Sequence, residues 1–168
     1  FLKDINLQHF YLDEIEKYTP IFYLIETLND FSIQNLKFSK SLIAKTFVLR
    51  KWKDKLIQKP INELDEMERF ELHKDLESIL PAFIIYLPEK DQLDWLNRWR
   101  NREDKLFHPT NLLDGDTIKK YIKINDGPLL GQLLSFLSME LAYRRIKNLD
   151  EAIYKAEQWF QQNAPKYD

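Results

Sequence analysis

The chain has 168 residues, a formal net charge of −2 and no cysteine. A chain of this length buries enough apolar surface to fold without a metal or a disulfide, and the lack of cysteine excludes thiolate zinc sites and a cysteine nucleophile. No apolar run approaches the roughly 18 residues of a membrane span, and residues 1–18 are too acidic for a secretory leader. We therefore expect a cytoplasmic protein without a membrane partner. Because the chain opens on Phe1 rather than on methionine, we also expect it to be a piece of a longer protein.

The composition favours helices over strands. Leu, Ile, Glu, Lys and Gln are common, whereas Val48 is the single valine and the three glycines all lie between residues 115 and 131. No Asn-Gly or similar hairpin turn stands between alternating apolar residues. The pattern predicts an all-α fold, a compact array of about seven helices without a sheet, in a single domain over residues 1–168.

The first part of the chain divides at its prolines and capping residues. Pro20 is predicted to begin a second helix, since its missing N–H is not needed in a first turn. Ser39 is predicted to cap a long helix in which Trp52 continues the apolar stripe, so Trp52 is assigned to the core. Helices are expected over residues 5–18, 20–30, 40–57, from Asn62 onward, 81–87 and 90–102.

The last part of the chain follows a loop around His108 and Pro109. Asp114 or Asp116 is predicted to cap a short helix ending at Ile122. Pro128 begins a helix expected to reach about Arg145. Asn148 and Glu151 resemble a capping box at the start of a last helix ending near Gln162.

Charge is unevenly distributed along the chain. Between Lys37 and Lys59 there are eight basic residues and one acidic residue, Asp54, whereas the stretch from Glu63 to Glu77 is strongly acidic. Such a chain can present a basic face despite its nearly neutral sum.

No catalytic constellation is recognisable. His9, His73 and His108 are isolated from one another, and the three glycines cannot form a phosphate-binding loop. The many carboxylates are typical of solvated helix faces. We therefore expect no catalytic residue and no metal site in this chain.

The most informative stretch runs from Leu112 to Gly131. Asp126 and Gly127 form a turn before Pro128, and Gly131 lies one turn into a helix, where glycine costs about 1 kcal/mol relative to alanine. One interpretation is close packing between the two helices; the other is that free backbone amides here meet an RNA phosphate. Lys119, Lys120 and Lys123 lie just upstream and suit the second. The two interpretations are compatible.

The same stretch carries a family resemblance. Its elements are Leu112-Leu113-Asp114-Gly115-Asp116, then Gly127-Pro128 with Gly131, then Ala142 and Ile146-Lys147-Asn148 with Glu151-Ala152. In this order they resemble the C-terminal signature of the bacterial poly(A) polymerase and CCA-adding tRNA nucleotidyltransferase family. The preceding His108-Pro109 and the apolar stretch Leu80-Pro81-Ala82-Phe83 resemble the cyanobacterial-type members of this family. The signature covers about residues 106–156, and a weaker similarity in helical pattern extends back through residues 30–105. One departure is Arg144, where the family commonly has a glycine.

The resemblance implies a role in holding RNA. Family members have a catalytic head whose paired aspartates bind magnesium and which uses CTP and ATP; nothing here matches that head, so no cofactor is expected in this chain itself. The later helical regions grip tRNA, and we expect tRNA or another structured RNA, not DNA, as the partner. The expected RNA-binding residues are Lys119, Lys120, Lys123, Gly127, Gly131, Arg144, Arg145 and Lys147, with Arg50 and Lys51 from the basic stretch around Trp52.

A rival interpretation is a helical protein–protein interaction or regulatory module without an RNA role. Its support is the net charge of −2, the acidic stretch and the 14% aromatic content. The sequence leaves open whether the longer protein adds all of CCA, part of it or poly(A), and which oligomeric state it adopts.

Overall fold

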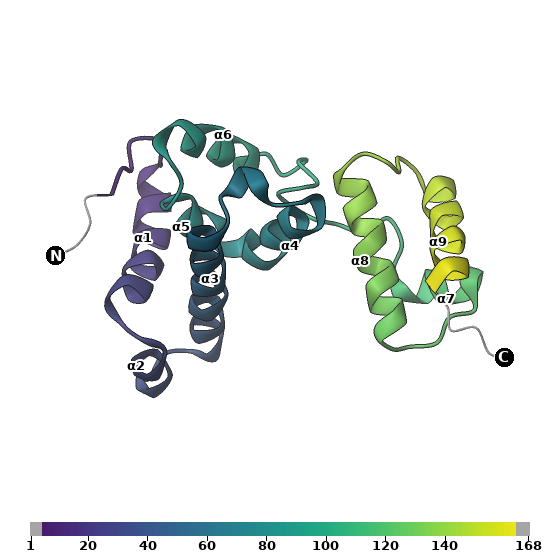
Figure 1. The fold of residues 1–168 in the computed structure, drawn as a ribbon, viewed down its shortest axis with the longest axis horizontal. Helices are drawn as coiled ribbons and strands as arrows, with labels where there is room; N and C mark the ends of the chain where they lie inside the picture. The colour runs from purple at the N-terminus through teal and green to yellow at the C-terminus, as the bar shows by residue number, and fades with distance from the viewer. Residues whose placement is uncertain (1–4, 164–168) are drawn as a thin grey trace. The chain divides into compact units, whose positions relative to one another are not determined.

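A computed structural model describes residues 5–163 (Figure 1). These residues contain helices and no strand, which confirms the all-α prediction. The chain divides into two compact units at Glu103–Asp104, and each is described here by itself. A single domain over residues 1–168 was predicted, and no proline- or glycine-rich linker in the sequence marks this boundary. None of the helices within residues 5–163 is long and apolar enough to span a membrane.

Unit 1, which ends at Glu103, is arranged around a short buried helix. All five residues of α5 (Leu80–Ile84) are buried, and α5 contacts helices before and after it in the chain. Its neighbours are α1 (Leu12–Thr27), α3 (Lys40–Gln58), α4 (Glu66–Leu76) and α6 (Glu89–Arg100). The shorter α2 (Asp30–Asn35) packs on α3, and two 3-10 turns span Ile61–Glu63 and Glu77–Ile79.

The predicted break at Pro20 is wrong. A single helix, α1, runs through Pro20, and residues 5–11 precede it without forming a helix. Proline inside a helix removes one hydrogen bond and costs about 3 kcal/mol. Burial of Tyr18, Phe22 and Ile25 along one face of α1 offsets that cost, while Pro20 itself lies on the exposed face.

Several predicted caps are confirmed. The Ser39 hydroxyl accepts from the Leu42 N–H at 3.2 Å, at the start of α3. The helix expected from Asn62 instead begins at Glu66, because Asp65 and Glu68 form a capping box there. This box is the stronger N-terminal signal, since it satisfies two backbone N–H groups at once.

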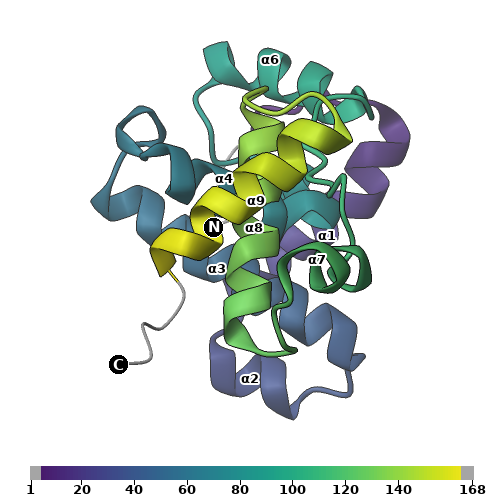
Figure 2. The same cartoon turned by 90° about the vertical axis from the view of Figure 1, so that its right-hand side faces the viewer.

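Unit 2, from Asp104 onward, consists of α7 (Gly115–Ile122), α8 (Pro128–Ala142) and α9 (Leu149–Asn163) in the described residues. Helix α9 packs against both α7 and α8, as Figure 2 shows for α8 and α9. Their shared core includes Ile118, Leu133, Ile146 and Ala152. Asp114, rather than the other candidate Asp116, caps α7 at 2.7 Å, and Asn148 caps α9 at 2.9 Å as predicted.

The end of α8 explains the departure at Arg144. The helix ends at Ala142 rather than near Arg145, and Arg144 adopts a left-handed backbone with φ of 58°. The N–H of Arg144 donates to the Leu141 carbonyl, and the N–H of Arg145 donates to the Glu140 carbonyl. This is a Schellman motif, whose left-handed position is usually glycine. The turn therefore keeps a glycine-type geometry with an arginine in it.

Candidate nucleic-acid interface

The expected RNA-binding residues lie at three separate places. Arg50 and Lys51 are on α3, in unit 1. The remaining residues were expected to form one cluster, but α8 separates them. This helix (Figure 1) has 15 residues and is therefore about 22 Å long. Gly127 directly precedes it and Arg144 follows its C-terminal end, so the two residues lie at opposite ends.

The side chain of Arg50 forms its contacts within unit 1. Its guanidinium pairs with Asp30 and donates to the carbonyls of Ile25 at 3.1 Å and Leu28 at 2.5 Å. Those carbonyls belong to the last turn of α1 and its C-terminal cap. The side chain of Arg50 is only 18% exposed. Arg50 thus closes the end of α1 instead of facing solvent as a phosphate ligand.

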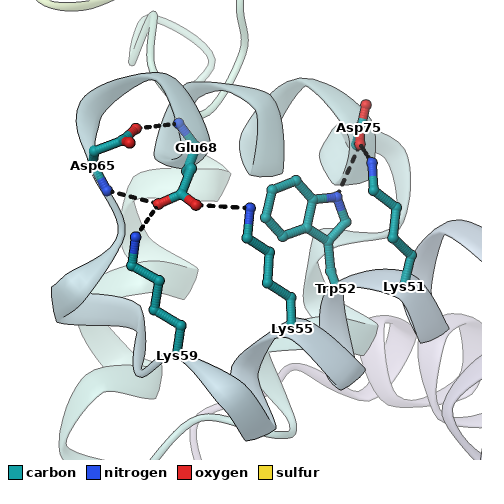
Figure 3. Close-up of polar contacts among 7 residues, drawn as sticks. All are labelled: Lys51, Trp52, Lys55, Lys59, Asp65, Glu68 and Asp75. Atoms are coloured by element: carbon teal, nitrogen blue, oxygen red, sulfur yellow. Dashed lines mark hydrogen bonds and ion pairs between the residues drawn. The ribbon is translucent and has the colours of Figure 1, made fainter.

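Lys51 and Trp52 share a carboxylate. The Lys51 ammonium and the Trp52 indole N–H both contact Asp75 Oδ2, at 3.0 Å and 2.9 Å (Figure 3). Trp52 is 1% exposed, which confirms its assignment to the core. The ammonium groups of Lys51 and Lys55 lie 5.1 Å and 4.8 Å from the centre of its ring.

Glu68 gathers two further lysines of the basic stretch. Its carboxylate pairs with Lys55 at 3.0 Å and Lys59 at 2.6 Å, and accepts from the Asp65 backbone N–H at 3.0 Å (Figure 3). The hydrogen bond from Lys59, followed by those from Asp65 and Lys55, lowers the pKa of Glu68 from 4.5 to about 2. The acidic stretch on α4 therefore pairs with the basic stretch on α3, and no free basic face results from these lysines.

The cations near α7 and α8 are arranged differently from those of α3. We define the α7–α8 surface by five exposed residues, Lys120, Tyr121, Lys123, Gly127 and Gly131. Just beside it, Lys119 pairs with Asp116 at 2.8 Å and Asp126 at 3.0 Å. These hydrogen bonds raise the pKa of Lys119. Lys119 thereby neutralises two neighbouring acids. Lys120 and Lys123 form no hydrogen bond or ion pair through their side chains with the rest of residues 5–163.

Both glycines of this surface are open to solvent. Gly127 has φ of 149°, and no side chain caps the first turn of α8. A Cβ atom added at Gly131 would meet no atom within 4 Å, so the chain itself does not require glycine there. At Gly115, by contrast, an added Cβ would lie 3.5 Å from Leu130, which supports close packing of α7 on α8 at that position.

The turn between α8 and α9 is balanced by acids. Glu140 is buried, and its two carboxylate oxygens pair with Arg145 at 3.1 Å and Lys155 at 2.9 Å. The backbone N–H of Lys147 donates to Glu151 at 2.8 Å. The side chains of Arg144 and Lys147 are exposed and, like those of Lys120 and Lys123, form no hydrogen bond or ion pair within residues 5–163. They lie at the carbonyl end of α8, which does not attract a phosphate, and Asp150 and Glu151 are close to them in the chain.

Tyr121 was missed as a site residue. It is a large apolar side chain on the exposed side of α7, whereas Ile118 and Ile122 of the same helix are buried. The spacing alone did not indicate this, because a residue three after Ile118 lies at the edge of the apolar stripe and could have been buried with it.

No catalytic or metal site is found in the described part of the chain. Within residues 5–163, no three His, Asp or Glu side chains are grouped so that they could hold a metal ion. His73 is buried, with its ring 4.9 Å from the ring of Trp95. A groove of about 470 Å³ in unit 1 is lined mainly by apolar side chains, and Asn62, Lys90 and Asp91 are its polar ones. This set offers no pairing of a nucleophile with a base.

Comparisons with known proteins returned no match: no family model, no curated protein and no solved structure is similar to this chain.

Proposed function

We propose that this chain is an RNA-binding helical region that positions the substrate of a tRNA nucleotidyltransferase acting on RNA 3′ ends, in the cytoplasm. The proposal joins the ordered signature at residues 106–156 with one observation, the α7–α8 surface. The nucleotidyl transfer itself, with magnesium and CTP or ATP, would belong to a catalytic head outside this chain.

The proposal rests mainly on the lack of ion-pair partners for the two lysines of the α7–α8 surface. Lys120 and Lys123 are exposed and without ion-pair partners, since Lys119 binds the nearby Asp116 and Asp126. A lysine that is already paired must lose its partner before it binds a phosphate, whereas an unpaired lysine releases only solvent and counterions. The uncapped first turn of α8 adds backbone N–H groups beside these lysines.

The rival function, a protein-interaction module, has a different observation in its favour. Leu12, Phe31 and Ile57 are each at least 75% exposed. They lie on α1, α2 and α3, and single exposed apolar residues are normal on protein surfaces. The unpaired lysines therefore favour RNA as the partner.

The test is binding of an RNA hairpin by the 168-residue chain, followed by fluorescence anisotropy at several salt concentrations. We expect the association constant to fall steeply as salt rises, because phosphate contacts release counterions. The double variant Lys120→Glu/Lys123→Glu should weaken binding by about tenfold or more and reduce the salt slope by about one per lysine.

A matched control is Arg144→Glu/Lys147→Glu, which changes the net charge equally at the other end of α8. We expect it to weaken binding much less. Equal loss in the two double variants would show that only total charge matters, and binding that does not respond to salt would point to the rival function.

A further inference from the structure

We propose that Tyr121 is a stacking platform for an unpaired nucleobase, so that the α7–α8 surface takes RNA with a single-stranded end in preference to a blunt duplex. The inference rests on the proposed function and deepens it, since it names the class of RNA that this surface recognises.

Tyr121 has neither a hydrogen bond nor a ring contact, unlike the other exposed tyrosines in the described residues. Three tyrosines are at least half exposed: Tyr11 at 60%, Tyr121 at 55% and Tyr154 at 60%. The Arg100 guanidinium covers the ring of Tyr11 at 3.8 Å, and the hydroxyl of Tyr154 accepts from Gln158 at 2.7 Å. Tyr121 makes no hydrogen bond and no ring contact within residues 5–163.

The position of Tyr121 on α7 presents this ring to solvent. Ile118 and Ile122 face the core of unit 2, and Lys120 and Tyr121 lie on the exposed side of the helix. The side chain is thus held on a helix whose opposite face is packed and whose N-terminus is capped by Asp114. The backbone at Tyr121 is therefore already ordered, so stacking of a base restricts only the side chain.

Charge next to the ring identifies the partner as a nucleic acid. Lys120 directly precedes Tyr121 and Lys123 follows two residues later, both exposed and without ion pairs in the described chain. Proteins that bind single strands combine aromatic platforms with cations that follow the phosphate backbone. An apolar protein partner would leave these two ammonium groups without compensation.

An unpaired base is required by the geometry of stacking. In an A-form duplex the faces of the bases are covered by their neighbours, so an aromatic side chain on a helix surface reaches only splayed or terminal bases. Stacking on Tyr121 therefore distinguishes RNA with a single-stranded end from the same RNA without one.

The experiment compares two RNAs with the 168-residue chain. One is a blunt hairpin closed by a structured tetraloop, so that the loop offers few unstacked bases. The other is the same hairpin with a short unpaired 3′ extension that contains 2-aminopurine, whose fluorescence decreases when the base stacks. We expect the wild type to bind the extended RNA more tightly and to quench its fluorescence. Tyr121→Leu, which keeps apolar bulk without an aromatic plane, should lower affinity for the extended RNA about fivefold or more and abolish the quenching.

Controls separate this inference from the proposed function. Tyr121→Phe keeps the ring and should keep the affinity and the quenching, and Tyr121→Leu should leave binding of the blunt hairpin unchanged. If Lys120→Glu/Lys123→Glu weakens both RNAs but Tyr121→Leu weakens neither, stacking is refuted and RNA binding stands. If neither RNA binds, both proposals fail together.

Discussion

The basic stretch of α3 and the α7–α8 surface look alike in sequence and differ in the fold. In the second half of α3 and at its C-cap, each of five cations has an acidic partner, and two acids of α4, Asp75 and Glu68, pair with three of them. The five are Arg50, Lys51, Lys53, Lys55 and Lys59. Beside the α7–α8 surface, Lys119 pairs with Asp116 and Asp126, whereas Lys120 and Lys123 form no ion pair within residues 5–163 and Lys120 has only a longer-range attraction to Asp114. The number of basic residues in a stretch of sequence therefore predicts an anion-binding surface less well than the acidic residues that pack beside them.

Among the substitutions that test this comparison, the largest change in stability is expected at Arg50. Arg50→Met keeps the length of the side chain but leaves Asp30 and the carbonyls of Ile25 and Leu28 without their donor. We expect the free energy of unfolding of unit 1 to fall by about 2–3 kcal/mol. Urea unfolding followed by tryptophan fluorescence measures it, since Trp52, Trp95 and Trp99 lie in this unit.

Lys120→Met is the matched control for Arg50→Met. It removes an exposed cation without partners, so its effect on unfolding should stay within about 0.5 kcal/mol. If both substitutions destabilised the protein equally, the division into paired and unpaired cations would be wrong.

A smaller and opposite effect is expected at Arg144. Its left-handed backbone costs about 1–2 kcal/mol in any residue that has a side chain. Glycine avoids this cost, but it has more conformational freedom in the unfolded chain, which cancels part of the stabilisation. Arg144→Gly should therefore stabilise unit 2 by about 0.5–1 kcal/mol, measured by thermal unfolding. Arg144→Ala removes the same side chain without relieving the backbone, so a gain of equal size in that variant would contradict this explanation.

The smallest effect is a pH dependence at Glu68, whose carboxylate is partly solvated. Its pKa in the folded chain is about 2, below its ordinary value of 4.5. Its ion pairs therefore stabilise the protein fully above about pH 4.5, and this contribution is lost as the pH falls toward 2. Glu68→Gln should lower the urea midpoint at about pH 6 and have less effect at about pH 3. An equal effect of this substitution at both pH values would exclude the ion pairs as its cause.

Several features of the fold that depend only on residues close together in the chain were predicted correctly from the sequence. Ser39, Asp114 and Asn148 were assigned as caps because an N-cap and its partner N–H are only two or three residues apart. Pro20 was misjudged because the burial of Tyr18 and Phe22, a tertiary effect, overrides its local preference.

The candidate site was predicted less well, for the same reason. The residues from Lys119 to Lys147 are close in sequence, yet a 15-residue helix separates the two groups. The partners of Arg50 and Lys51 are 20 and 24 residues away, beyond the reach of any local pattern. The exposure of Tyr121 depends on how α7 packs in unit 2, because its spacing from Ile118 places it at the edge of the apolar stripe.

The pairing of α3 with α4 also bears on the order in which the chain folds. Lys59 and Glu68 are nine residues apart, whereas the Arg100–Glu14 pair spans 86 residues. Closing a short loop costs less entropy than closing a long one, and contacts close in sequence form faster. Attraction between the basic and acidic stretches can thus bring α3 and α4 together before the ends of unit 1 meet. On this account, salt slows the early part of folding even though the ion pairs contribute little to the final stability.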